Sequence, residues 1–155
     1  MKIELRRIHH NLKLSEETNA YTAEVWIDGE RAFEARNQGQ GDCDLYRQVG
    51  RWTEAEVNAW LRANRPIRPF RGLNLEHDLE AEVGDLLAHE LEYRRLKRLA
   101  RTNLITIERG QIFQYPLRKR PFDLGARAGT ASNPEAVIVN RGNDDVIRQA
   151  LAILL

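Results

Sequence analysis

Residues 21–35 read YTAEVWIDGERAFEA, and this stretch decides the fold of the N-terminal part of the chain. Every second side chain from Tyr21 to Ile27 is apolar, which is the period of a half-buried strand. The pair Asp28-Gly29 follows and can adopt the positive φ angles that a tight hairpin turn requires. With a similar alternation at residues 2–9, the pattern predicts an antiparallel meander with strands near 2–9, 20–27 and 31–36.

The segments that follow the meander predict a loop and a short helix. Residues 37–50 contain three glycines and several short polar side chains, which is typical of a loop. Thr53 and Glu56 have the spacing of a capping box, so a helix is expected to begin there. Pro66 is expected to end it, because proline has no backbone donor and restricts the residue before it.

The C-terminal half predicts two more helices and a second hairpin. Leucine and valine recur at helical spacing over residues 74–101, with Asn74 as the expected cap. A hairpin is expected over 104–107 and 112–115, a strand over 136–140, and a final helix after Asn143. Strands and helices do not alternate, so we expect an α+β fold with a mainly antiparallel sheet. It would form one domain over residues 1–155, with a possible division near residues 66–73.

The composition excludes several classes of protein. The chain has 155 residues, with 24 Lys and Arg against 23 Asp and Glu, so its net charge of +1 gives no overall attraction to nucleic acid or membrane. Cys43 is the only cysteine, which excludes an intrachain disulfide and a cysteine-based zinc site. The longest apolar runs are far shorter than a membrane span. We therefore expect a cytoplasmic protein that does not enter a membrane.

The glycine-rich loop is the first candidate site. It comprises Asn37, Gly39, Gly41, Asp42, Cys43, Asp44 and Tyr46. Alternating glycines can turn backbone N–H groups towards an anion, the aspartates could hold a cation, and Cys43 could be a nucleophile with His9 or His10 as base. The alternative is a turn-rich connector with a small buried thiol, since glycine and asparagine dominate turns.

The same stretch carries a resemblance. A hairpin followed by Asn37-x-Gly39-x-Gly41 and then Tyr46 resembles a pattern in small uncharacterised proteins of bacteria and their phages. Those proteins have a second glycine where Asp42 stands, and they continue with a long helix that becomes basic. The resemblance implies a phage or mobile-element setting and no particular chemistry.

Three basic clusters form the second candidate site. Their members are Arg62, Arg65, Arg68 and Arg71; then Arg94, Arg95, Lys97, Arg98 and Arg101; then Arg118, Lys119 and Arg120. Gathered on one face, they would attract phosphates, and Phe70, Tyr115 and Phe122 could stack on bases. The alternative is that they pair with the acids of residues 76–92. A metal shared by Asp85 and His89 is a further candidate, against the simpler interpretation of a solvated helix face.

No catalytic or cofactor motif is recognisable in the chain. The sequence therefore favours a non-catalytic accessory protein, with no cofactor, that binds a host protein or a nucleic acid through segregated charge. A small enzyme or nucleotide- or metal-binding protein, centred on loop 37–46, is the first alternative. A structural domain that forms homo-oligomers is the second.

Overall fold

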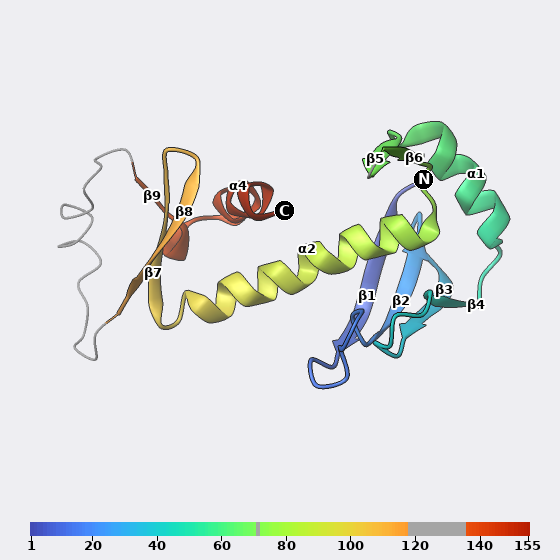
Figure 1. The fold of residues 1–155 in the computed structure, drawn as a ribbon, viewed down its shortest axis with the longest axis horizontal. Helices are drawn as coiled ribbons and strands as arrows, with labels where there is room; N and C mark the ends of the chain where they lie inside the picture. The colour runs from blue at the N-terminus through green and yellow to red at the C-terminus, as the bar shows by residue number, and fades with distance from the viewer. Residues whose placement is uncertain (71, 118–135) are drawn as a thin grey trace. The chain divides into compact units, whose positions relative to one another are not determined.

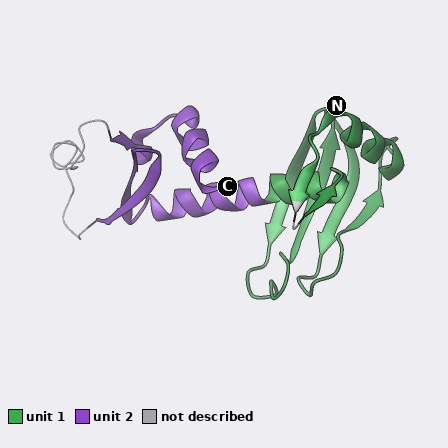
Figure 2. Cartoon of the chain, turned by 45° about the horizontal axis from the view of Figure 1, so that its top comes forward, with its two compact units in different colours: residues 1–87 green, residues 88–155 purple. Residues whose placement is uncertain are grey.

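The computed structural model describes residues 1–70, 72–117 and 136–155 (Figure 1). The fold is α+β with mainly antiparallel strand pairing, as the sequence predicts. The chain divides into two compact units, Met1–Leu87 and Ala88–Leu155 (Figure 2). The boundary lies inside a helix, later in the chain than residues 66–73, where the sequence suggested a division.

The first unit is built on a four-stranded antiparallel sheet with the order β1-β2-β3-β4. Strands β1 (Ile3–His10), β2 (Tyr21–Ile27) and β3 (Glu30–Asn37) form the predicted meander. Asp28 and Gly29 have φ angles of 49° and 85°, which confirms the expected turn geometry. Strand β4 (Leu45–Gln48) corrects the prediction of a loop over all of 37–50, since these residues pair with β3.

Two helices add further buried side chains to the first unit. Helix α1 (Glu54–Asn64) begins at Thr53 with both hydrogen bonds of the capping box, as predicted. Its Val57 and Leu61 are fully buried, and each burial stabilises the fold by about 2 kcal/mol. The first turns of α2 (Leu79–Leu99) bury Leu79 and Val83.

The predicted start of the long helix was wrong. Residues expected to begin the helix instead form a hairpin, β5 (Arg68–Phe70) with β6 (Leu73–Leu75). Gly72 turns this hairpin with a φ of 82°, so Asn74 lies in a strand and is not a helix cap. The helix continues through Gly84, whose position has open space where a side chain would project.

The second unit has its own small core. Strands β7 (Asn103–Glu108) and β8 (Gln111–Pro116) form the predicted second hairpin, and β9 (Val137–Ile138) pairs with β7. A short 3-10 helix, η1 (Val139–Arg141), follows, and α4 (Asp144–Leu154) begins at Asn143, whose side chain accepts a hydrogen bond from the backbone of Val146. The core includes Leu96, Ile105, Ile107, Val139, Ala150 and Leu151. No helix among the described residues combines the length and apolar composition of a membrane crossing.

Candidate functional site: the open face of the first sheet

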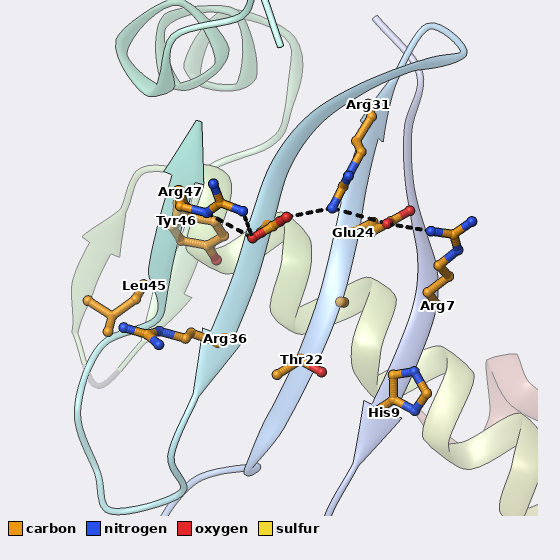
Figure 3. Close-up of a pocket in the computed structure, with 11 residues that line it drawn as sticks. Arg7, His9, Thr22, Glu24, Arg31, Arg36, Leu45, Tyr46 and Arg47 are labelled. Atoms are coloured by element: carbon orange, nitrogen blue, oxygen red, sulfur yellow. Dashed lines mark hydrogen bonds and ion pairs between the residues drawn. The ribbon is translucent and has the colours of Figure 1, made fainter. Parts of the chain in front are cut away.

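The strand register places a row of polar side chains on one face of the four-stranded sheet. His9 pairs with Thr22, Thr22 pairs with Arg36, and Arg36 pairs with Leu45. Directly paired residues point to the same face of a sheet. These four side chains therefore form a line across β1, β2, β3 and β4, on the face turned away from the first turns of α2 (Figure 3).

A second row lies two residues further along β2, β3 and β4, because alternate residues share a face. It contains Glu24 on β2, Glu34 on β3 and Arg47 on β4, which are paired in the register. Strand β1 carries one extra residue between Arg6 and His9 compared with its partner. Arg7 lies in this bulge with a φ of 50°, and its side chain joins the same row (Figure 3).

Ion pairs hold the second row together, and Arg31 of β3 joins it by contacting both glutamates. We call these five residues the charge ladder: Arg7, Glu24, Arg31, Glu34 and Arg47. One Arg31 nitrogen lies 3.1 Å from a Glu24 oxygen and 2.6 Å from a Glu34 oxygen. Arg7 closes one end at 3.0 Å from Glu24, and Arg47 closes the other end on Glu34 (Figure 3). Three guanidinium groups therefore share two carboxylates.

Both carboxylates of the charge ladder are held in their charged form. The pKa of Glu34 lies below its ordinary value because Arg47 donates hydrogen bonds to it and Arg31 adds its positive charge. The pKa of Glu24 is also lowered, first by a hydrogen bond from the Trp26 ring nitrogen and then by Arg31 and Arg7. The ladder therefore keeps one more positive than negative charge at neutral pH.

The charge ladder lines a hollow of about 600 Å³, which we call the first hollow. Arg36, His9 and Thr22 also line it. Among the described residues, the side chains of Arg36 and His9 make no ion pair or hydrogen bond. The lining therefore presents four guanidinium groups against two carboxylates, and the Arg36 guanidinium has no partner within the described part of the chain. This arrangement can attract and hold an anionic group.

A second hollow of about 820 Å³ adjoins the first, because His9 and Thr22 line both. Its other side is formed by the loop that follows β1 and by the start of the glycine-rich loop. Among the described residues, no carboxylate lines it, and Lys13 is the positively charged side chain of its lining. Leu12 and Leu14 lie at its rim with exposed fractions of 75% and 56%.

The glycine-rich loop is bound to the rest of the unit by its own polar groups. The Asn37 carboxamide oxygen accepts hydrogen bonds from Thr18 at 2.9 Å and from the Gly39 backbone at 2.7 Å. Its nitrogen donates to the Asp42 carbonyl and to the Asp44 carboxylate. All these groups already have partners, so this geometry favours the connector interpretation of Asn37.

Close contacts explain the two glycines of this loop. Gly39 has a φ of 88°, and a Cβ atom there would lie 2.1 Å from the Leu14 carbonyl oxygen. Gly41 has a φ of 87°, and its backbone N–H lies 3.3 Å from the Thr18 hydroxyl. The two glycines let the loop approach residues 14–18 closely, and both N–H groups are used within the protein.

The remaining loop candidates divide into a buried cluster and exposed side chains. The Asp44 carboxylate accepts hydrogen bonds from the hydroxyls of Tyr21 and Tyr46. Burial, with Asp44 beside them, raises the pKa of both tyrosines, so the hydroxyls remain donors. Cys43 is exposed rather than the buried thiol of the connector interpretation. No group of three metal-ligating side chains occurs in the described part of the chain, including around Asp42 and Asp44.

The first basic cluster meets carboxylates from the segment 76–92, as the alternative interpretation of the sequence expected. Arg62 contacts Glu76 at 3.3 Å and Arg68 contacts Asp85 at 2.8 Å. Arg65 forms two hydrogen bonds with Glu82, a buried side chain that also contacts the buried His77 at 2.8 Å. We call these three pairs the helix clamp, because they join α1 and the β5–β6 hairpin to α2 or to the segment that leads into it. Arg71 lies outside the described residues.

The second cluster is partly paired, and the third is not described. Arg94 contacts Glu90 at 2.7 Å, Arg95 contacts Glu92, and the Lys97 amine lies 4.4 Å from the centre of the Tyr93 ring. Arg98 and Arg101 make no ion pair among the described residues. Arg118, Lys119, Arg120 and Phe122 lie outside the described residues, as does the side chain of Phe70, and Tyr115 donates a hydrogen bond to Glu108.

Sequence reasoning missed the arginines of the open face: Arg7, Arg31, Arg36 and Arg47. They lie on three different strands and form no run in the sequence. The available signal was the polar half of the strand alternation, in which Thr22 and Glu24 on β2 face Arg36 and Glu34 on β3. The alternation of apolar and polar residues does not reveal the bulge that brings Arg7 onto this face.

Comparison of the chain with known protein families, with curated proteins and with solved structures finds no match in any of the three. The function is therefore inferred from the geometry of the described residues.

Proposed function

We propose that this protein is a non-catalytic binding protein whose open sheet face takes an anionic partner. One observation carries the proposal: four guanidinium groups line the first hollow against two carboxylates, and Arg36 has no partner among the described residues. Guanidinium groups suit this role because they bind phosphate and carboxylate oxygens through two parallel hydrogen bonds. The partner is a nucleic acid or an acidic protein, and the resemblance adds a phage or mobile-element setting.

The open face is preferred over the helix clamp because the charges of its first hollow are less completely neutralised. Each described arginine of the helix clamp has a carboxylate of its own, so binding an anion there would require an ion pair to break. Along the first hollow, three arginines share two glutamates, and Arg36 has no carboxylate among the described residues. The anion would therefore meet a positive field without losing an existing contact of Arg36.

The proposal is tested by the affinity of three labelled polyanions, measured by fluorescence anisotropy at 50 and 200 mM salt. The probes are a twelve-nucleotide single-stranded DNA, the matching duplex and a twelve-residue polyglutamate peptide. We expect at least one to bind with an affinity that falls as salt rises, because binding releases counterions. Arg36→Glu is expected to weaken that binding by about tenfold or more.

Arg68→Glu is the matched control, since it reverses one charge on an exposed arginine of the same unit outside the open face. We expect it to weaken the binding by no more than twofold. Thermal unfolding of both variants shows whether each remains folded. The proposal is wrong if no probe binds at 50 mM salt, or if Arg68→Glu weakens binding as much as Arg36→Glu does.

A further inference from the structure

We infer that the anionic partner is a single-stranded nucleic acid that runs along both hollows, from Arg36 on β3 to Lys13 beyond β1. This inference rests on the proposed function and names the class of partner. It starts from continuity: His9 and Thr22 line both hollows. The two hollows therefore share part of their lining, and the strand bound in the first hollow continues into the second past these two residues.

The side chains of the two hollows suit the two parts of a nucleotide chain, its phosphates and its bases. The first is rich in guanidinium groups, which suit phosphates. The second has Lys13 and no carboxylate, and it is lined by the exposed amides of Asn11, Gln38 and Gln40. Among the described residues, the side chains of Gln38 and Gln40 make no hydrogen bond. Free amide groups can both donate to and accept from the edges of unpaired bases.

The rim of the second hollow adds an apolar contact. Leu12 and Leu14 are the most exposed leucines of the loop after β1, on either side of Lys13. Apolar side chains can pack against the face of an unstacked base. An acidic peptide would use the guanidinium groups equally well, and its carboxylates would accept from the amide nitrogens, but its ionised side chains would offer no donor to the amide oxygens.

A base must be unpaired to reach the amides and leucines of the second hollow, so the inference favours single strands over duplexes. The first hollow by itself accommodates only part of such a strand. Affinity should therefore increase with length until both hollows are covered, within the roughly four to sixteen nucleotides that single-strand-binding folds occupy.

The test compares single-stranded DNA of about four and about twelve nucleotides, the twelve-base-pair duplex and polyglutamate, by anisotropy at 50 mM salt. We expect the twelve-nucleotide strand to bind at least fivefold more tightly than each of the other three. Lys13→Glu should weaken only the long strand, whereas Arg36→Glu should weaken both lengths. The double variant Gln38→Ala with Gln40→Ala should weaken the long strand by a larger factor than it weakens any binding of polyglutamate.

The outcomes separate this inference from the proposed function. If polyglutamate or the duplex binds as tightly as the long strand, and Lys13→Glu changes nothing, the inference is overturned while the anion-binding face stands. If length matters but the glutamine variant binds normally, the second hollow does not contact bases, and the inference is overturned as well. Failure of every probe would remove the proposed function and this inference with it.

Discussion

The helix clamp and the open sheet face are both rich in arginine, but their charges are balanced differently. In the clamp, Arg62, Arg65 and Arg68 each have a carboxylate from the segment that leads into α2 or from α2 itself. On the open face, Arg31 bridges two glutamates, and Arg36 has no partner within the described residues. The clamp stabilises the unit, whereas the face keeps positive charge available to a partner.

The difference shows that a cluster of arginines in a sequence says little about a binding surface. What matters is how many carboxylates the fold brings to the same place, and whether they are buried. Glu82 is buried in the clamp, with Arg65 and His77 as its partners. A buried charge that loses its partner is costly, while an exposed pair contributes little.

The largest effect is expected from Glu82→Gln. The variant keeps the shape of the side chain but leaves Arg65 without its carboxylate and His77 with a neutral partner in a buried position. We expect the free energy of unfolding, measured in urea, to fall by about 3 kcal/mol.

Asp85→Asn is the matched control, because its pair with Arg68 is exposed, and it should cost less than about 1 kcal/mol. Equal losses for the two variants would contradict the difference between buried and exposed pairs.

The same glutamate should make the stability of the protein depend on acid pH. Although burial opposes it, hydrogen bonds from Arg65 and His77 lower the pKa of Glu82 below its ordinary value of 4.5. A lowered pKa in the folded state contributes stability above pH 4.5, and this contribution is lost as the pH falls through the lowered value. Glu82→Gln should therefore lose less stability than the natural protein when urea unfolding is repeated at lower pH.

The next effect concerns the glycine-rich loop, which resembles the clamp because the Asn37 side chain and the N–H groups of Gly39 and Gly41 have partners within the protein. Gly39→Ala would force a side chain into a φ of 88° and towards the Leu14 carbonyl. We expect it to destabilise the protein by about 2 kcal/mol. Gly29→Ala has a similar φ but open space around it, so it should cost about 1 kcal/mol. Thermal unfolding of the two variants would show whether close packing, and not φ alone, requires Gly39.

Local signals predicted much of the fold. The alternation around Asp28-Gly29, the capping box at Thr53 and the cap at Asn143 all act within a few residues, and the structure confirms the elements that they indicate. The errors arose where pairing with another strand decides the outcome. Residues 45–48 form a strand because β3 lies beside them, and residues 73–75 pair with 68–70 instead of extending α2.

The candidate site was harder to predict than the fold, for the same reason. Arg36 is an unremarkable residue in the sequence, and its position opposite Thr22 and Leu45 follows from pairing with β2 and β4. The first cluster that was visible in the sequence meets carboxylates of residues 76–92 in the fold, which neutralise its described arginines. A charge pattern along the chain therefore indicates which side chains are available, and the register determines which of them face a partner.

The smallest effect is expected from Glu34→Gln, and it is a gain. This variant removes one of the two carboxylates of the charge ladder and frees Arg47, while Arg31 keeps its ion pair with Glu24. We expect the polyanion that binds best to bind roughly threefold more tightly at 50 mM salt, since one repulsive charge is lost and the Arg47 guanidinium group becomes available. Glu76→Gln removes an equivalent exposed charge from the helix clamp and should leave the affinity unchanged.

A variant damaged in folding would not bind more tightly, so a gain confined to Glu34→Gln would locate the partner on the open face. Equal gains in both variants would mean that the partner senses only the net charge of the protein.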